Sequence, residues 1–452
     1  MLSKRSGYKM KTPRYVVLTD ILDGFEVDDI QSMIRLMLYS NEIDIEALIS
    51  CTSCFVKGNV SGRVGLIHSI IDAYGETLPN LRAHASGWRS ADYYHSITYA
   101  GIDEYGLMPS FGFASMKYKE NTGVKALIEC ILREDSRPLY IGLWGGANTL
   151  AQAVWQIEKL MPDKLSTALG KLRIYGISDQ DHASRWLRKK YGDRLFWIVS
   201  PSRGSWFGNY TYWKAAWPGI SSDLVKHGSE DGVHKTLGFS GGRRDLVSND
   251  WIDTNIRSKG ALGALYPHPK YIVEGDTPSF LWIIPNGLNV PERPDYGGWG
   301  GRYEYYRPEK AQFGVTERHS IWTNASDTVL GSDGRMHTSP QATIWRWREA
   351  FQNDFAARML WTSSPDPAIA SCRPEIKGEI RDWRLNVCAD GCELFFYPYP
   401  EAGSFTGKCQ ISHDKKIIIS GGRSGETLHI IAEARTKSAP FLTSYRRFII
   451  TL

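Results

Sequence analysis

Three aspartates near the N-terminus have the spacing of a cation site. Asp20 closes a short apolar run, and Asp28 and Asp29 follow after a short loop. A turn at Asp23-Gly24 would let this loop fold back, so that the three carboxylates converge. Converging carboxylates repel each other unless a cation lies among them, and hard oxygen ligands favour calcium or magnesium. From these residues alone, the favoured interpretation is that Asp28 and Asp29 cap a helix, as acids at helix N-termini commonly do.

Short apolar segments alternate with amphipathic segments from about residue 15 to residue 265. The expected strands cover 15–20, 45–50, 138–144, 172–177 and 195–200, and the expected helices cover 29–39, 64–74, 149–159 and 182–190. This alternation predicts an α/β fold with a doubly wound, mostly parallel sheet. Sites in such folds form at the carboxyl ends of the strands, which is where Asp20 is expected to lie.

The character of the chain changes after residue 265. Gly, Pro, Trp and Tyr crowd the stretch 285–303, which predicts a long functional loop, and 343–361 is expected to be helical again. Short segments of period two, separated by turns, follow from about residue 366 and predict an Ig-like β-sandwich. We therefore expect one domain over 12–361 and a C-terminal sandwich over 366–452.

The composition argues against several classes of function. The 54 Lys and Arg nearly balance the 49 Asp and Glu, and no basic block occurs, so nucleic acid is not an expected partner. Seven Cys in 452 residues argue against a disulfide framework, and Cys51 and Cys54 are expected to be buried thiols. The sequence has no apolar run long enough for a membrane span, and a membrane is not an expected partner. No signal peptide is evident, which favours the cytoplasm, with secretion as the alternative if a signal was removed.

Four sequence blocks carry a resemblance to a known family. They are Thr19-Asp20…Asp28-Asp29, Trp144-Gly-Gly-Ala-Asn-Thr, Ile177-Ser-Asp-Gln-Asp181 and Glu274-Gly-Asp276-Thr-Pro-Ser-Phe. The blocks resemble those of the inosine/uridine-type nucleoside hydrolases, and most closely a nucleoside-hydrolase-like subfamily described as cellulose-binding proteins. Each block alone is weak, but four in the same order are specific. The resemblance runs from about residue 15 to the C-terminus.

This resemblance implies a calcium site. The ion would be held by Asp20, Asp29, the backbone carbonyl of Trp144, and Asp276. In the resembled enzymes calcium also binds two sugar hydroxyls and presents a water to the anomeric carbon. A neighbouring aspartate takes the proton of that water while the glycosidic bond breaks. The resemblance assigns this catalytic role to Asp28, with Asp20 as the second catalytic candidate.

Three features depart from the resembled pattern. The loop between Asp20 and Asp28 is longer, so Asp23 is a rival for the first ligand position, although Asp20 is preferred because it ends the strand. Residues 178–182 stand in the region of the family's Asn/Glu/Asn sugar-binding block. Gly275 replaces the His that helps some members to protonate the departing base. A sugar or another alcohol is therefore considered as the leaving group, beside a nucleobase.

Further side chains are candidates for contacts with the sugar. They are Asn148, Asp179, Asp181, Glu274 and Trp299, with Tyr303 as a second aromatic ring beside Trp299. Each has an alternative role in the structure alone. Asn148 and one of the two aspartates would cap helices, and the two aromatic rings would pack their own loop onto the domain.

Two functions from different classes follow. The first is a calcium-dependent hydrolase of an N- or O-glycosidic bond, acting on a sugar or glycoside. The second is a carbohydrate-binding protein that keeps the fold and the metal site without turnover. A weaker third is a surface or scaffold protein that associates through the sandwich, and a homo-oligomer is also considered.

Overall fold

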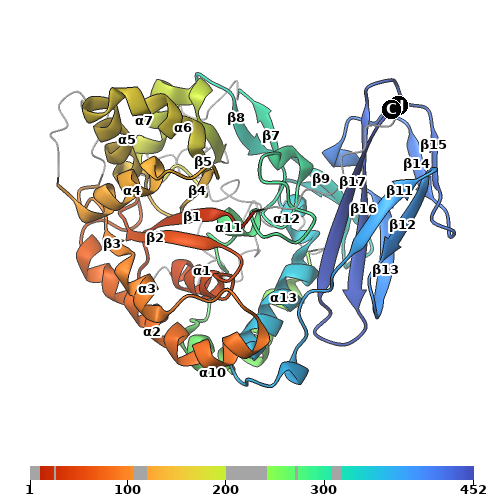
Figure 1. Cartoon of the computed structure of the whole chain (residues 1–452), viewed down its shortest axis with the longest axis horizontal. Helices are drawn as coiled ribbons and strands as arrows, with labels where there is room; N and C mark the ends of the chain where they lie inside the picture. Colours follow the sequence, from red (N-terminus) through yellow and green to blue (C-terminus); the bar gives the residue numbers. More distant parts are fainter. Residues whose placement is uncertain (1–10, 25–26, 106–119, 200–241, 270–272, 308–316) are drawn as a thin grey trace.

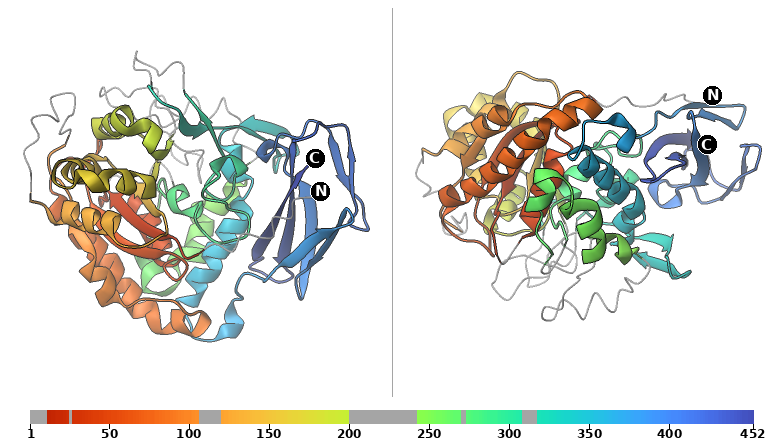
Figure 2. Two further views of the ribbon diagram at one scale, coloured as in Figure 1. Left: turned by 45° about the horizontal axis from the view of Figure 1, so that its top comes forward. Right: turned by 90° about the horizontal axis from the view of Figure 1, so that it is seen from below.

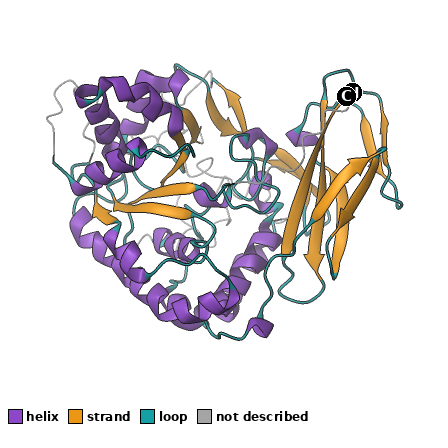
Figure 3. Cartoon of the chain, viewed as in Figure 1, coloured by secondary structure: helices purple, strands orange, loops and turns teal. Residues whose placement is uncertain are grey.

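The computed structural model describes residues 11–24, 27–105, 120–199, 242–269, 273–307 and 317–452. A large α/β body lies beside a smaller body of antiparallel strands, which is blue in Figure 1. Figure 3 shows the same division by element type, with almost all helices around the larger sheet. In the described residues no helix is both long and apolar enough to cross a membrane.

The large sheet has eight strands in the order β3-β2-β1-β4-β5-β6-β8-β7. Every neighbouring pair is parallel except β7 and β8, which are antiparallel. The strands are β1 (Arg14–Thr19), β2 (Asp44–Ser50), β3 (Thr98–Ala100), β4 (Leu139–Leu143), β5 (Leu172–Gly176), β6 (Phe196–Val199), β7 (Tyr303–Tyr306) and β8 (Ile321–Asn324). The predicted doubly wound, mostly parallel sheet is thereby confirmed. Strands β3, β7 and β8 were not predicted, and the last two lie in the stretch after residue 265.

Helices cover both faces of this sheet, as the turned views in Figure 2 show. The bounds are α1 (Asp28–Met37), α2 (Val60–His84), α3 (Ala91–Ser96), α4 (Thr122–Leu132), α5 (Asn148–Leu160), α6 (Leu165–Lys171) and α7 (His182–Tyr191). Alternate residues of β1 point to opposite faces. Tyr15 and Val17 pack in a core with α1 and α2, whereas Val16 and Leu18 pack in a second core with α4, α5, α6 and α7.

Further helices complete the larger body. They are α9 (Asn249–Ile252), α10 (Gly260–Leu265), α11 (Pro278–Leu281), α12 (Ala342–Trp345) and α13 (Arg348–Trp361), with a small hairpin of β9 (Asp327–Leu330) and β10 (Met336–Ser339). The helix expected over 343–361 is thus split at Arg346-Trp347. Helix α13 lies between the α/β body and the C-terminal strands in Figure 1.

The C-terminal strands pair only with each other, and none joins the large sheet. The strands are β11 (Lys377–Arg381), β12 (Arg384–Cys388), β13 (Cys392–Pro398), β14 (Lys408–Ile411), β15 (Ile417–Ser420), β16 (Thr427–Thr436) and β17 (Thr443–Thr451). They enclose a separate apolar core that includes Leu385, Ile430 and Ile450. This arrangement is the expected C-terminal β-sandwich. Cys51 and Cys54 are buried free thiols, and Cys388, Cys392 and Cys409 are also free.

Candidate functional site

The acidic cluster forms where β1 meets the start of α1. Strand β1 ends at Thr19, so Asp20 follows directly, and α1 begins at Asp28. Asp28, Asp29 and Asp276 each offer a carboxylate oxygen, and these three oxygens lie within 4.8 Å of one another. All three residues are buried. The structure therefore brings together side chains that are about 250 residues apart in the sequence. They meet at the carboxyl end of the sheet.

Asp20 belongs to the same cluster. Its side chain is 2% exposed, and its Oδ2 is buried with no hydrogen-bond partner. The turn after β4 passes beside it, since a Cβ added at Gly145 would lie 2.9 Å from Asp20 Oδ1. Only glycine allows this approach, which places the backbone after Trp144 next to the carboxylate. Asp23, the rival for the first ligand position, is exposed, and the bend after it uses a positive φ of 95° at Gly24.

The carboxylates of the cluster are held at high pKa. Burial raises the pKa of Asp20 to about 6, and burial together with the charge of Asp20 raises the pKa of Asp28 to about 7. Burial and the charges of Asp20 and Asp28 raise the pKa of Asp29 well above its ordinary value. Arg63 lowers the pKa of Asp20 and Asp29, but its guanidinium donates to the carbonyls of Cys51 and Gly58 rather than to a carboxylate.

Neighbouring side chains fix the orientation of the cluster. Thr19 Oγ1 donates to Asp29 Oδ1. On the far side, Ser279 Oγ donates to the carbonyl of Asp276 at 2.6 Å, and the indole Nε1 of Trp144 donates to Ser279 Oγ at 2.7 Å. The strand end, the turn after β4 and the loop at Asp276 are therefore joined by direct contacts.

This donor set fits a hard divalent cation. Carboxylates are the preferred ligands of calcium, which also accepts backbone carbonyls. The pKa of each N-terminal carboxylate is raised by burial or by a like charge, so a cation would relieve the strain of ionising them. The carbonyl of Trp144, the expected backbone ligand, accepts a hydrogen bond from Gln180 Nε2 at 2.5 Å. A carbonyl has two lone pairs, so this bond leaves one for a cation.

Asp179 and Asp181 do not face the cluster as free ligands. Asp179 accepts from both terminal nitrogens of Arg188, at 2.7 and 2.5 Å. Asp181 caps α7 by accepting from the amides of Ala183 and Ser184, and it also accepts from the amide of Asn148 at 2.9 Å. For Asp181 the capping alternative is correct, and the sugar-contact prediction for both aspartates finds no support.

Asn148 and Glu274 are likewise occupied by the protein. Asn148 Nδ2 donates to the carbonyl of Glu104 at 2.9 Å and to Thr52 Oγ1 at 3.2 Å. Glu274 is fully buried and pairs with Arg35, with 2.5 Å between Arg35 Nε and Glu274 Oε2. These contacts tie loops together, so neither side chain is available to a sugar in this structure.

The expected aromatic sugar platform is wrong. Trp299 is 0% exposed, and its ring packs against Phe351 of α13 and Tyr445 of β17. Tyr303 is 2% exposed. Its hydroxyl contacts the hydroxyl of Tyr175 and donates to the carbonyl of Gly300. The packing alternative applies to both rings, because Tyr303 packs against Tyr175 of β5 and Trp299 packs against Tyr445 of the sandwich.

Gln180 is the residue that the sequence analysis missed. It lies between Asp179 and Asp181, is 7% exposed, and reaches the Trp144 carbonyl through Nε2, while its Oε1 is buried with no hydrogen-bond partner. Alternation along an extended segment points Gln180 away from its two acidic neighbours. The alternation can be recognised in the sequence, but an uncharged amide is a weaker indication of a metal site than the carboxylates on either side of it.

A solved structure matches the chain over nearly its whole length. A nucleoside hydrolase-related hypothetical protein from Saccharophagus degradans, described as associated with carbohydrate metabolism, is 27% identical, with a TM-score of 0.73. The match covers 98% of this chain and 100% of that protein. No curated protein matches the chain.

Two further solved structures are more distant. The type III effector protein XopQ, complexed with adenosine diphosphate ribose, is 12% identical over 78% of this chain and 95% of that chain, with a TM-score of 0.35. The plant nucleoside hydrolase PpNRh1 is 11% identical over 75% of this chain and 99% of that chain, with a TM-score of 0.31. Neither similarity is high enough to support a conclusion.

The family model described as "Cellulose-binding Sde182, nucleoside hydrolase-like domain" matches residues 14–303, which span β1 to the start of β7 and include every residue of the acidic cluster. This chain belongs to that family of nucleoside hydrolase-like proteins.

Proposed function

We propose that the protein is a calcium-dependent hydrolase of an N- or O-glycosidic bond in a sugar-containing substrate. The observation that carries this proposal is the buried acidic cluster, with carboxylate oxygens of Asp28, Asp29 and Asp276 within 4.8 Å of one another and Asp20 beside them. Family membership supports the same reaction class.

Asp20, Asp29, Asp276 and the carbonyl of Trp144 would hold the cation. When bound, calcium would supply the positive charge that orients sugar hydroxyls and makes a nearby water more acidic. The remaining chemistry falls to side chains of this protein. Fixed negative charge in a buried site would stabilise the positive charge that develops at the anomeric carbon in the transition state.

Asp28 is the proposed general base. Without a cation, burial and the charge of Asp20 raise its pKa to about 7. The positive charge of a bound calcium would lower this pKa, so the carboxylate would be ionised at neutral pH and able to take a proton. Its carboxylate would accept a proton from the attacking water as the glycosidic bond breaks. Backbone amides of Gly275 and Asp29 lower the pKa of Asp28 and so orient its carboxylate. These amides hold the Asp28 carboxylate beside the proposed ligands Asp29 and Asp276.

The proposed leaving group is an alcohol or a sugar, with a nucleobase as the alternative. Gly275 offers no side chain to protonate a departing base. An O-glycoside with a good leaving group needs less help from an acid, so aryl glycosides are the first substrates to test.

The test combines calcium titration with a substrate screen. Thermal unfolding is measured with calcium chloride and with a chelator, and reducing-sugar release is followed on a panel of nucleosides and aryl glycosides. The proposal expects a calcium-dependent rise in melting temperature and calcium-dependent release from a member of the panel. The same melting temperature with calcium chloride and with the chelator would contradict the proposal.

The second candidate is a carbohydrate-binding protein without turnover. The observations that favour it are the two departures from the hydrolase pattern, since residues 178–182 stand in the region of the sugar-binding block and Gly275 replaces the His that helps to protonate a departing base. The family's description as cellulose-binding agrees with this alternative. Calcium-dependent binding of cellobiose with no release from any substrate of the panel would establish it.

A further inference from the structure

We propose that the buried ion pair of Arg35 and Glu274 positions Asp276 opposite Asp28 and Asp29, and so sets the calcium affinity of the site. The proposal rests on the function proposed above, because it assumes that the acidic cluster binds a cation. Arg35 and Glu274 are not members of the acidic cluster, and the proposal gives them a role in positioning one of its carboxylates.

The loop that carries Asp276 must be held next to the first turn of α1. Asp28 and Asp29 belong to the first turn of α1, whereas Asp276 lies in a loop just before α11. No strand or long helix fixes that loop. Within it, Glu274 has a φ of 52°, in the left-handed region that a side chain seldom adopts. Such a conformation persists only where its surroundings enforce it.

Helix α1 enforces it through the residues that follow Asp29. Gln31 Oε1 accepts the backbone amide of Glu274 at 2.9 Å, and Ser32 Oγ lies 3.2 Å from Thr277 Oγ1. One turn after Gln31, Arg35 reaches the carboxylate of Glu274, with 2.5 Å between Nε and Oε2 and 3.1 Å between Nη2 and Oε1. The helix that carries two acids of the cluster therefore also holds the loop that carries the third.

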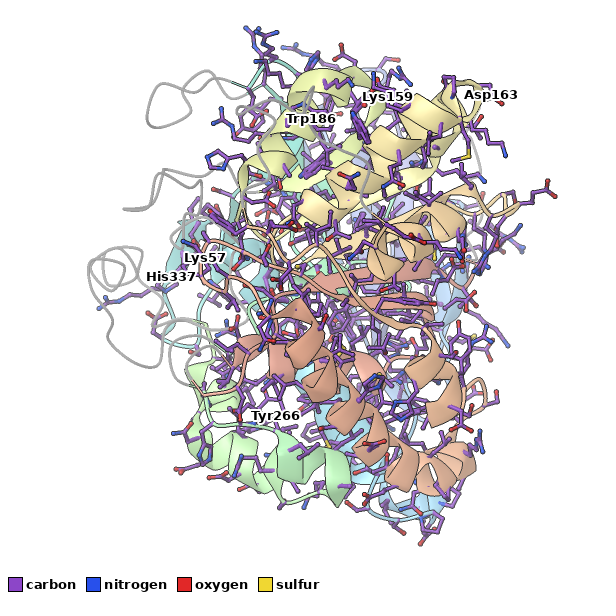
Figure 4. All side chains as sticks on the ribbon, turned by 90° about the vertical axis from the view of Figure 1, so that its left-hand side faces the viewer. Lys57, Lys159, Asp163, Trp186, Tyr266 and His337 are labelled. Atoms are coloured by element: carbon purple, nitrogen blue, oxygen red, sulfur yellow. The ribbon has the colours of Figure 1, made fainter. Side chains whose placement is uncertain are left out.

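The carboxylate of Glu274 has no capacity left for another role. Tyr266, labelled in Figure 4, directly follows α10 and donates its hydroxyl to Glu274 Oε1 at 2.7 Å. Thr277 Oγ1 donates to Glu274 Oε2 at 2.9 Å. With Arg35 these donors use both oxygens, so Glu274 is a fixed anchor two residues before Asp276 rather than a metal ligand itself.

Arg35 is anchored equally well on its other side. It donates to Gln352 Oε1 and to the carbonyl of Phe351 on α13, and its guanidinium lies 3.9 Å from the ring centroid of Phe355. Both members of the pair are essentially inaccessible, at 0% and 1% exposure of the side chains. Removing two charges from water is unfavourable, and buried pairs are often replaced by apolar residues without loss of stability. A role in fixing one geometry explains why a charged pair stands here.

The experiment separates positioning from folding by replacing both charges together. In Arg35→Met/Glu274→Leu no unpaired charge remains, so the apoprotein is expected to keep a higher melting temperature than either single variant, in which one buried charge loses its partner. The dissociation constant for calcium, measured by calorimetry with calcium chloride, is expected to rise about 10- to 100-fold, the usual loss when residues that orient metal ligands are removed.

The matched control is a second buried pair far from the cluster. Arg14 and Glu46 are 2.6 Å apart with 0% exposure of both side chains, at the opposite ends of β1 and β2 from Asp20. Arg14→Met/Glu46→Leu is expected to leave the calcium affinity unchanged. A milder variant, Thr277→Val, removes one hydroxyl from the same network, and we expect a smaller loss of calcium affinity in a folded protein.

The outcomes are distinct. If the wild type binds no calcium, the proposed function fails and the positioning role fails with it. If the wild type binds calcium and neither Arg35→Met/Glu274→Leu nor Thr277→Val weakens binding, the positioning role alone is wrong. Equal weakening in the Arg14→Met/Glu46→Leu control would also overturn it, since the effect would then come from general loss of stability. Weakening confined to the Arg35 and Thr277 variants supports it.

Discussion

Asp28 and Asp276 present carboxylate oxygens within 4.8 Å of each other, although one opens the first helix and the other lies in a loop far along the chain. Such proximity of buried acids is unfavourable by itself, because like charges repel most strongly away from water. The proposed calcium ion gives this arrangement a physical reason, and its consequences can be measured.

The roles of the paired aspartates predict different defects. We expect Asp28→Asn to lower turnover by about 10²–10⁴-fold with calcium binding largely kept, because an amide of the same shape cannot take a proton. We expect Asp29→Ala to lose both turnover and calcium binding, because a charged ligand is removed. Calorimetry with calcium beside a rate assay on the substrate found in the screen distinguishes them. Normal turnover by Asp28→Asn would instead make Asp20 the base.

The raised pKa values predict that calcium matters more as pH rises. The pKa of Asp20 is about 6 and that of Asp28 about 7 in the folded protein, above the unfolded value of 3.8. Their ionisation therefore penalises the calcium-free folded state, whose stability is lost as pH rises through these values. We expect the gain in melting temperature from calcium to grow between about pH 5 and about pH 8. A gain that does not change with pH would argue against the cluster as the calcium site.

His429 predicts the opposite pH dependence in another part of the molecule. Burial and the charges of Arg447 and Arg293 lower its pKa to about 3, from 6.5. The neutral ring accepts from Arg447 Nη1 at 3.0 Å, so stability is present above the unfolded pKa and is lost as pH falls from 6.5 toward 3. The loss is at most about 1.4 kcal/mol for each pH unit. Chemical denaturation of the wild type and His429→Gln should diverge in this window, and parallel curves would refute the role of His429.

The buried position of Trp299 predicts a defect of stability rather than of sugar binding. Its ring fills the contact between the Gly-rich loop, α13 and β17. Trp299→Ala should lower the free energy of unfolding by about 3–5 kcal/mol, as large-to-small changes in cores do. Urea denaturation measures this change. If Trp299→Ala instead bound cellobiose more weakly and kept its free energy of unfolding, Trp299 would be a sugar-binding residue.

The parallel sheet could be predicted from the sequence because it follows local rules, whereas the spacing of the acids alone favoured a helix cap and the cation site was expected from the resemblance. Apolar runs such as 15–20 alternate with amphipathic segments, and strand ends in such folds lie at one edge. Asp20, Asp28 and Asp29 are therefore placed by β1 and α1 alone. The position of Asp276 came from the resemblance, because its loop is fixed by long-range contacts with Gln31 and Arg35 that no local pattern encodes.

The failures of prediction share a different cause. Trp299 and Asp181 were candidates for sugar contacts, and tertiary packing and helix capping use them instead. Burial of a loop residue depends on what covers the loop, here α13 and the sandwich, which sequence periodicity does not reveal. Strand β8 was missed because it pairs with β6 only through Ile198 and Trp322, and so its position depends on a distant partner.

The most direct test of the calcium site is diffraction from crystals grown with calcium chloride, with anomalous scattering used to locate the ion. The proposed function predicts one calcium ion among Asp20, Asp29 and Asp276, with the carbonyl of Trp144 in its coordination shell. An acidic cluster without an ion, in crystals of protein saturated with calcium, would contradict the proposed function.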